Sequence, residues 1–255
     1  MREKETAIVV SQKSIGTDIY SMIIKTKAAE TAKAGQFISM YCHDKTKLLP
    51  RPISICEVNK DEGTLRIVYR VVGGGTEEFS TYTPGEKVDI IGPLGNGFMK
   101  RENKKAILIG GGIGIPPMVQ LAKELKNITE VQVVAGYRNE LFLTEELENN
   151  GTLYIATEDG STGTKGTVID AIKEQCVEGD VIYACGPTPM LKAIKEYATE
   201  KGIECQLSLE ERMACGIGAC LACVCNSTEK DHHSNVNNKR ICKDGPVFLA
   251  EEVEL

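Results

Sequence analysis

Four cysteines near the end of the chain have the spacing of ligands to an iron–sulfur cluster. Cys215, Cys220 and Cys223 follow a Cys-x4-Cys-x2-Cys pattern, and Cys242 stands alone after a longer gap. This is the ligand pattern of a plant-type [2Fe-2S] cluster, in which four thiolates hold two irons. A structural zinc site is the alternative, but zinc ligands usually come as two short Cys-x2–4-Cys pairs. The pattern therefore favours the cluster.

A further thiol, Cys225, lies in the same loop, so other combinations of three ligands can be drawn. Only the first three cysteines reproduce the x4-x2 spacing, and we expect Cys225 to be a small apolar residue without a ligand role. His232 and His233 could suggest a Rieske centre, but neither follows a cysteine at short spacing. They lie in a polar run, residues 226–240, which predicts an exposed loop.

Two motifs in the first hundred residues carry groups that bind phosphate. Arg51-Pro52-Ile53-Ser54 combines a guanidinium, which can hold phosphate with two parallel hydrogen bonds, with a nearby hydroxyl. Gly73-Gly74-Gly75-Thr76 precedes a possible short helix, whose free N–H groups attract anions. Taken alone, the first motif could be a surface arginine and the second a flexible hinge. The two motifs gain weight only if they serve one ligand.

Two turns in the middle of the chain follow predicted strands. Gly110-Gly111-Gly112-Ile113-Gly114 joins a strand to a helix, where a sheet offers N–H groups to a pyrophosphate. The third glycine of the usual dinucleotide fingerprint is missing. Cys185-Gly186-Pro187 follows a second strand. Either turn alone could be a packing feature, but two such turns at one edge of a sheet favour a ligand.

The elements that must position these residues fall into two patterns. Short apolar runs separated by Gly, Asp and Pro predict an antiparallel barrel over the first hundred residues. From residue 104 strands alternate with helical segments, which predicts a doubly wound parallel sheet. The barrel strands are predicted at residues 7–10, 19–26, 36–42, 53–58, 64–72 and 87–91. The later strands are predicted at 106–109, 131–135, 153–156, 181–184 and 204–208, and the helices at 116–126, 167–175 and 189–200.

Composition excludes several classes of protein. The chain has 255 residues, 42% hydrophobic and 26% charged, which is ordinary for a folded protein. Its net charge of -6 favours neither nucleic acid nor an anionic membrane as a partner. The charged start lacks the apolar core of a signal peptide, and no apolar run approaches the roughly 18 residues of a membrane span. Ten cysteines in such a chain indicate a reducing cytoplasm and metal chemistry rather than disulfides.

Taken in order, the motifs resemble those of the ferredoxin-NADP reductase superfamily. The matching segments are Arg-Pro-Ile-Ser, Gly-Gly-Gly-Ile-Gly-Ile-Pro-Pro-Met and Cys-Gly-Pro-Thr-Pro-Met. The tail Glu-Glu-Arg-Met-Ala-Cys-Gly-Ile-Gly-Ala-Cys-x-Ala-Cys narrows the resemblance to the electron-transfer subunits of class B dihydroorotate dehydrogenases. The resemblance covers essentially the whole chain. Ile53 is a departure, because many reductases have an aromatic residue there that stacks on the flavin.

The resemblance implies three cofactors and their residues. It places Arg51 on the FAD pyrophosphate, Ser54 near the reactive flavin nitrogen and Cys185 beside the nicotinamide, the last two as catalytic residues. The residues implied for FAD are Arg51, Pro52, Ile53, Ser54, Val68, Tyr69, Arg70, Gly75 and Thr76. Those implied for NAD are Gly111, Gly112, Gly114, Cys185 and Gly186. The cluster ligands are Cys215, Cys220, Cys223 and Cys242.

The resemblance also implies a partner and a division of the chain. The partner is an FMN-containing catalytic subunit that oxidises dihydroorotate in pyrimidine biosynthesis, in a heterotetramer with two of each subunit. Residues 1–100 would bind FAD, 101–208 NAD and 209–255 the cluster. The small subunit of an NAD(P)H-ferredoxin transhydrogenase or sulfhydrogenase is an alternative, but those commonly have Asp at the position of Cys215. A non-catalytic cluster carrier or redox sensor is a third hypothesis, and it leaves the flavin motifs without a role.

Overall fold

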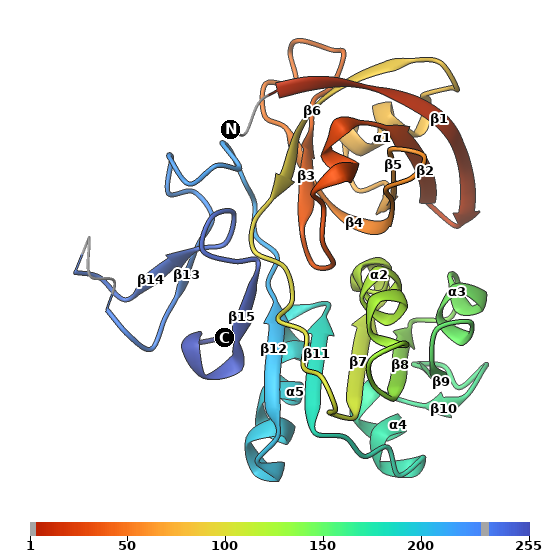
Figure 1. The fold of residues 1–255 in the computed structure, drawn as a ribbon, viewed down its shortest axis with the longest axis vertical. Helices are drawn as coiled ribbons and strands as arrows, with labels where there is room; N and C mark the ends of the chain where they lie inside the picture. The colour runs from red at the N-terminus through yellow and green to blue at the C-terminus, as the bar shows by residue number, and fades with distance from the viewer. Residues whose placement is uncertain (1–3, 231–234) are drawn as a thin grey trace.

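The structure is a computed structural model that describes residues 4–230 and 235–255. It has three parts: a β-barrel, an α/β domain below the barrel, and a C-terminal segment beside the junction of the two (Figure 1). After the last parallel strand the chain runs up beside the barrel and then returns to the edge of the sheet (Figure 1). The C-terminal segment therefore contacts both of the other parts.

The barrel forms because its strands alternate between buried and exposed side chains. In the first strand Ala7 and Val9 are buried, whereas Ile8 and Val10, which alternate with them, are exposed. The strands form the antiparallel barrel that the sequence predicted, and it closes in the order β1-β2-β5-β4-β3-β6. Its strands are β1 (Lys4–Gly16), β2 (Ile19–Lys25), β3 (Phe37–Met40), β4 (Arg51–Asn59), β5 (Thr64–Arg70) and β6 (Lys87–Leu94). The short helices η1 (Lys27–Glu30) and α1 (Gly74–Ser80) belong to this part.

Strand β1 is much longer than the predicted range 7–10. It continues to Gly16 as a polar, partly exposed ribbon whose pairing with β2 is interrupted by two register shifts. Bulges of this kind bend a strand and let it curve around a barrel. The apolar pattern that marks a strand is absent from this half, because most of its side chains are not buried.

The α/β domain is a largely parallel sheet in the order β10-β9-β8-β7-β11-β12-β15. The order reverses direction between β7 and β11, and ligands of such sheets bind at this point, beyond the carboxyl ends of the strands. Its parallel strands are β7 (Ala106–Gly111), β8 (Val131–Tyr137), β9 (Thr152–Thr157), β10 (Thr164–Lys165), β11 (Val181–Cys185) and β12 (Glu204–Ser208). The predicted glycine-rich and cysteine-containing turns follow β7 and β11.

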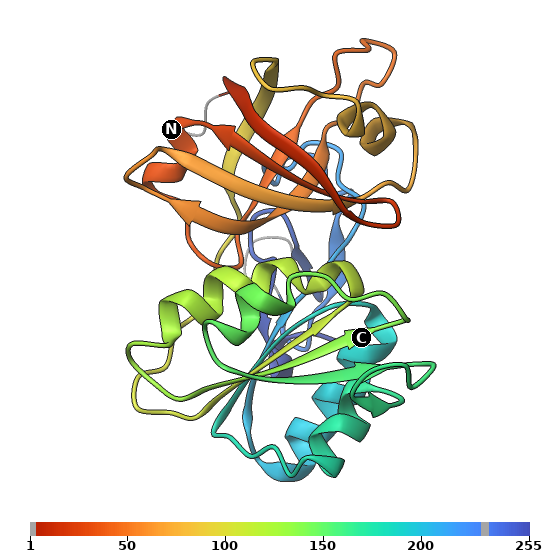
Figure 2. The same ribbon diagram turned by 90° about the vertical axis from the view of Figure 1, so that its right-hand side faces the viewer.

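Helices cover both faces of this sheet, as expected of a doubly wound fold. Two helices lie between the sheet and the barrel and two lie on the opposite face (Figure 2). The inner pair is α2 (Pro116–Leu125) and α3 (Thr144–Glu148), and the outer pair is α4 (Val168–Glu174) and α5 (Thr188–Lys201). The short turn η2 (Gly112–Gly114) leads from β7 into α2. Helix α3 was not predicted, because five residues are too few for a clear helical period.

The C-terminal segment contains more regular structure than the sequence predicted. The polar run 226–240, predicted as an exposed loop, contributes to an antiparallel hairpin of β13 (Val224–Asn226) and β14 (Asn238–Arg240). His232 and His233 lie outside the described residues. Strand β15 (Val247–Leu249) then pairs antiparallel with β12 and extends the sheet, and η3 (Ala250–Glu252) follows it. The segment is thus tied into the α/β domain.

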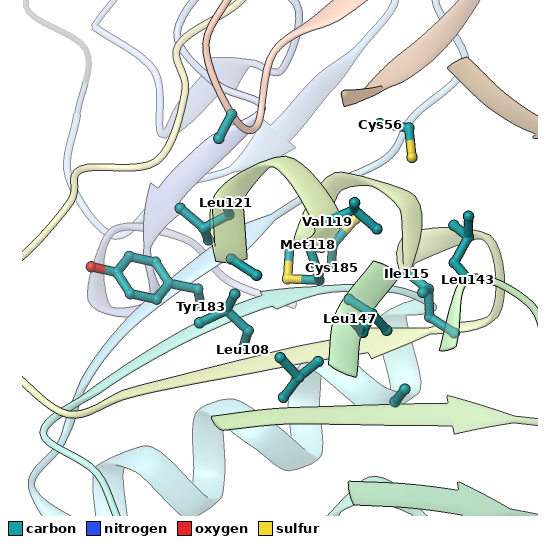
Figure 3. Close-up of a cluster of buried hydrophobic side chains, with 14 of the residues drawn as sticks. Cys56, Leu108, Ile115, Met118, Val119, Leu121, Leu143, Leu147, Tyr183 and Cys185 are labelled. Carbon is teal, nitrogen blue, oxygen red and sulfur yellow. The ribbon is translucent and has the colours of Figure 1, made fainter. Parts of the chain in front are cut away.

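The barrel and the α/β domain are joined by a closed contact surface, here called the seam. Helix α2 packs beneath β4, where the buried Cys56 lies above the side chains of the helix (Figure 3). The Val58 N–H donates to Gln120 Oε1 across the seam at 2.8 Å. Arg66 Nη1 contacts carboxylate oxygens of Glu57 in the barrel and Glu146 in α3, each at 2.7 Å. Paired polar groups and apolar packing therefore fix the two parts against each other.

No helix in the described part of the chain combines the length and the apolar character needed to cross a bilayer.

Candidate functional site

A cleft of about 530 Å³ is lined by all three parts of the chain. The barrel contributes the motif at Arg51, the α/β domain contributes Ile113 from the glycine-rich turn, and the C-terminal segment contributes Met213. Eight of the nine residues predicted for FAD line this one cleft. They are Arg51, Pro52, Ile53, Ser54, Val68, Tyr69, Arg70 and Thr76.

The ninth residue, Gly75, lies directly under Arg51. A Cβ atom at Gly75 would come within 1.9 Å of Arg51 Nε, so only glycine lets the guanidinium lie over the start of α1. The Arg51 side chain also donates to the carbonyl of Leu49. The Thr76 hydroxyl accepts the Val72 N–H at 2.9 Å and donates to the Gly73 carbonyl at 3.0 Å. Thr76 therefore shapes the turn with its side chain, and it can offer a ligand its backbone N–H.

The two turns at the edge of the sheet pack directly against each other. A Cβ atom at Gly114 would lie 2.3 Å from the Cys185 carbonyl oxygen and 2.7 Å from Gly186 Cα. Gly112, by contrast, has a φ of 53° and open space where a side chain would be. Gly114 thus allows close packing of the turns, while Gly112 leaves the backbone accessible. Strands β7 and β11 are adjacent, with Cys185 opposite Gly110, so both turns lie at the reversal point of the sheet.

The side chain of Cys185 does not reach either turn's open surface. It is fully buried among core side chains, close to α2 (Figure 3). Burial raises the pKa of its thiol well above the ordinary value, so the thiol stays protonated at neutral pH. Ser208, which lies opposite Cys185 in β12, lines the cleft instead. The catalytic role predicted for Cys185 remains a prediction. Ser54, the other residue predicted to be catalytic, lines the cleft.

Several residues of the cleft were not identified from the sequence. Phe37 lies opposite Ser54 in the neighbouring strand, and Glu210 follows the end of β12. Glu210 is exposed as a residue, and the partial loss of hydration of its carboxyl raises the pKa of that group. The residues at the end of β12 could be identified only from the strand order, which places the end of β12 beside the end of β11. The lining residues missed are Phe37, Val72, Ile113, Ser208, Leu209, Glu210, Glu211, Arg212, Met213 and Pro246.

The four predicted cluster ligands fall into two pairs. Cys215 contacts Cys220 side chain to side chain, and Cys242 contacts Cys223 in the same way. The Cys242 N–H also donates to Cys223 Sγ at 3.4 Å. Within the described residues no three His, Cys, Asp or Glu side chains meet closely enough to hold one metal ion. Two pairs suit a [2Fe-2S] cluster, with two thiolates on each iron, better than a tetrahedral zinc site.

The loop around Cys215 turns backbone N–H groups toward the sulfur. Ile217 and Ala219 donate to Cys215 Sγ at 3.4 and 3.3 Å. Although burial raises the pKa of Cys215, these bonds and two from Cys220, one from its backbone and one from its side chain, lower the pKa to about 6. Arg240 in β14 supports the loop by donating to the Gly218 carbonyl at 3.2 Å. The loop is therefore built to stabilise a negatively charged sulfur.

Cys225 makes its hydrogen bond outside these pairs. Its thiol lies 3.6 Å from the Lys239 carbonyl oxygen in the hairpin, and it lines a separate cavity of about 430 Å³ near Gly186. Burial raises the pKa of this thiol. This contact is compatible with the prediction from the spacing that Cys225 is not a ligand, which stays a prediction.

Three family models match successive parts of the chain. An oxidoreductase FAD-binding domain matches residues 6–98, and an oxidoreductase NAD-binding domain matches residues 108–196. The iron-sulfur cluster binding domain of dihydroorotate dehydrogenase B matches residues 210–254. These ranges correspond to the barrel, most of the parallel sheet and the C-terminal segment.

Relatives match the chain from end to end. A protein of Caldanaerobacter subterraneus subsp. tengcongensis is 43% identical over 99% of both chains. A Geobacillus protein is 43% identical over 100% of both, and a Listeria monocytogenes protein is 44% identical over 97% of both. Each is named dihydroorotate dehydrogenase B (NAD(+)), electron transfer subunit.

Solved structures agree with this fold. A chain from a structure described as NADH-dependent reduced ferredoxin-NADP oxidoreductase has a TM-score of 0.87 and 32% identity, over 97% of this chain and 89% of that chain. A ferredoxin reductase of carbazole 1,9a-dioxygenase has a TM-score of 0.68 at 20% identity, over 79% of this chain and 66% of that chain. The second likeness shows the fold alone.

Proposed function

Because the chain belongs to the family of electron transfer subunits of NAD⁺-dependent dihydroorotate dehydrogenase B, we propose that it passes electrons between a catalytic subunit and NAD. It is an oxidoreductase subunit of pyrimidine biosynthesis that uses a [2Fe-2S] cluster and FAD. The observation that carries the proposal is the cleft, because the flavin motif, the dinucleotide turn and the segment leading to the cysteine loop all line it.

FAD fits this cleft by the chemistry of its walls. We assign the pyrophosphate to Arg51 and the start of α1, where Gly75 leaves room for the guanidinium. Ser54 lies on the wall where the flavin ring would be held, and Arg70 adds positive charge. Ile53 leaves the wall without the aromatic residue common in related reductases.

NAD fits the reversal point of the sheet. Gly111, Gly112 and Gly114 would face its pyrophosphate, and Gly186 would lie beside the nicotinamide. Cys185 would lie beside the nicotinamide through its backbone, since its thiol is inside the core. The open backbone at Gly112 is the feature of this turn that a phosphate group requires.

The cluster would be held by Cys215, Cys220, Cys223 and Cys242, two thiolates to each iron. When bound, FAD can exchange two electrons with NAD and one with the cluster, so it converts between the two. The residues of this chain position the cofactors and tune their potentials. We therefore expect no acid or base for dihydroorotate on this chain.

The cysteine loop has the exposure that an electron partner requires. Cys220 is exposed, and the apolar side chains of Ile217 and Leu221 beside it are 45% and 59% exposed. Ala219 and Ala222 are exposed as well, whereas Met213 is half-buried and lines the cleft. We propose that this apolar surface contacts the FMN-containing catalytic subunit, in a cytoplasmic heterotetramer with two copies of each.

We further propose that the division of the chain follows the cofactors. Residues 1–100 would bind FAD, 101–208 NAD and 209–255 the cluster. The pairing of β15 with β12 supports a refinement, in which the third segment is also an integral part of the NAD-binding sheet.

Mixing experiments test the proposal. The isolated chain, loaded with FAD and cluster, should oxidise NADH with artificial acceptors but show no reaction with dihydroorotate. Addition of an FMN-containing dihydroorotate dehydrogenase subunit should produce dihydroorotate-dependent reduction of NAD⁺. Reduction of the isolated chain by dihydroorotate would contradict the proposal. A visible spectrum without flavin would favour a bare cluster carrier.

One observation supports a second candidate function. This chain is 32% identical to a chain from a structure described as NADH-dependent reduced ferredoxin-NADP oxidoreductase, and the two share the fold. A small subunit of a transhydrogenase would bind a different partner and would couple NADH to ferredoxin and NADP. Failure to bind an FMN subunit, together with ferredoxin-dependent activity in a complex, would favour it over the dihydroorotate reaction.

A further inference from the structure

One buried hydroxyl group has no partner in the fold. Among residues 4–230 and 235–255, Ser39 Oγ is the only buried side-chain nitrogen or oxygen atom without a hydrogen-bond partner. Ser39 is 0% exposed. A buried hydroxyl that makes no hydrogen bond destabilises a protein, so such a group calls for a partner that the chain itself does not supply.

The position of Ser39 identifies where that partner would be. Ile38 and Met40 on either side pack into the barrel core, so Ser39 points outward from β3. A Cβ atom at Gly216 would come within 2.7 Å of Ser39 Oγ. Gly216 directly follows Cys215 and has a φ of 68°. The hydroxyl therefore lies against the turn that carries the first cluster ligand.

Ser39 also lies beside the wall of the flavin cleft. It is paired with Pro52 of the flavin motif in β4, and Phe37, two residues earlier on the same outer face, lines the cleft. The hydroxyl is thus located between the two redox sites assigned above. Cys215 Sγ already accepts two backbone N–H groups, from Ile217 and Ala219.

We propose that the Ser39 hydroxyl donates a hydrogen bond to a sulfur of the cluster bound in the cysteine loop and thereby raises its reduction potential. This inference rests on the proposed function, since it requires the cluster. The physical reason is charge: the reduced cluster has one more negative charge than the oxidised one, and a donor stabilises the more negative sulfur more strongly. Ser39 acts as a positioning and tuning residue, and it transfers no electron itself.

Ser39→Ala in the cluster-loaded chain is the direct test. We expect the iron content to be unchanged and the midpoint potential of the cluster, from a redox titration followed by electron paramagnetic resonance, to fall. A loss of about tenfold in the equilibrium constant for reduction corresponds to a shift of 59 mV for one electron. Ser39→Thr keeps the hydroxyl and should shift the potential less.

Ser21→Ala is the matched control. Ser21 is also buried in the barrel, but its hydroxyl accepts from Arg66 Nε at 2.9 Å and β2 lies opposite β3 in the barrel order. Loss of this hydroxyl should leave the cluster potential unchanged. If Ser39→Ala does not assemble a cluster, Ser39→Gly, which also lacks the hydroxyl, takes its place in the titration.

Thermal stability supplies a second measurement. In the cluster-free chain Ser39→Ala removes an unsatisfied group and should raise the melting temperature, whereas in the loaded chain it should not. An unchanged potential with a rise in melting temperature in both forms would overturn the inference and leave Ser39 merely unsatisfied. A wild-type chain that never gives a [2Fe-2S] signal would instead overturn the proposed function.

Discussion

The cysteine loop and the flavin cleft are held together in different ways. All four proposed cluster ligands come from residues 215–242, with thiols that range from buried to exposed and only a short hairpin nearby. The cleft gathers residues from Phe37 to Pro246 on the frame of a closed barrel and a sheet. The loop therefore depends on its cluster for order, because metal binding and folding are coupled at such sites. The cleft is formed by the fold itself.

The flavin cleft and the cysteine loop also differ in the groups that supply positive charge. Arg51 and Arg70 from the barrel and Arg212 from the C-terminal segment line the cleft, and guanidinium groups suit it to phosphate. The loop instead uses backbone N–H groups directed at Cys215. Side-chain substitutions should therefore weaken the cleft by degrees, whereas loss of a single thiol should abolish the cluster.

The largest effect is expected from the cysteines. Cys215→Ala, Cys220→Ala and Cys223→Ala should each lose or cripple the cluster, because each removes one of two thiolates from an iron. Iron content and electron paramagnetic resonance of the reduced protein measure the loss. FAD retention should be almost unchanged in all three variants, since the cleft does not depend on the loop's order.

Cys225→Ala is the control for these variants. Its thiol contacts the Lys239 carbonyl and it lies outside the x4-x2 spacing, so the cluster signal should persist. An intact signal in Cys215→Ala would show that the ligand assignment is wrong. Loss of FAD together with the cluster would show that the two sites are not independent.

Arg51→Ala should give the next largest effect, and this effect should appear in the flavin cleft. The contact between a desolvated guanidinium and phosphate contributes about 1.5 to 3 kcal/mol, which is roughly one to two decades in FAD affinity. Flavin content after gel filtration measures it, and the cluster signal should be unaffected. Arg51→Lys should restore retention only in part, because lysine lacks the planar fork. Full retention in Arg51→Ala would place the pyrophosphate elsewhere.

The difference between a site built from one segment and a site assembled from distant segments explains what the sequence could predict. The ligand set is local, so the spacing of Cys215, Cys220 and Cys223 was sufficient for the cluster, and the turn and strand signals were sufficient for the barrel and sheet. Ser208 and Glu210 reach the cleft only because β12 ends beside β11, which requires the strand order. Strand β15 has three residues and pairs with β12, which lies about forty residues earlier in the chain, so no local pattern predicts it.

Cys185 shows a different limit. Its position after a strand correctly placed its backbone at the ligand edge, but sequence does not reveal which way a side chain points. The structure places the thiol in the core beneath α2, where the burial that raises its pKa also removes it from the cleft. Side-chain burial at the end of a strand depends on the element packed above it.

The partner surface should respond separately from both cofactor sites. Leu221→Asp places a charge in the exposed apolar surface of the cysteine loop, and aspartate tolerates the φ of 59° found there. We expect about tenfold weaker binding of the catalytic subunit, with normal FAD and cluster content. Val10→Asp, at an exposed position on the outside of the barrel, is the control. Equal binding of the catalytic subunit by both variants would show that the interface does not include the cysteine loop.

The smallest effect concerns a carboxylate that shapes the phosphate end of the cleft. Glu78 in α1 accepts from Lys47 Nζ and Tyr82 Oη, both at 2.8 Å, and from the His43 N–H. These contacts fix the loop before Arg51 onto the helix. Although burial alone raises the pKa of Glu78, the hydrogen bonds outweigh it and lower the pKa from 4.5 to about 2.

Glu78 should therefore stabilise the barrel in a pH-dependent way. A carboxyl whose folded pKa lies below its unfolded value contributes fully above pH 4.5, and its contribution is lost as the pH falls toward 2. Urea denaturation of the cluster-free chain, followed by circular dichroism at pH 7 and pH 3, should show wild type more stable than Glu78→Gln at pH 7 and the difference smaller at pH 3. A difference independent of pH would mean that Glu78 acts by shape and not by charge.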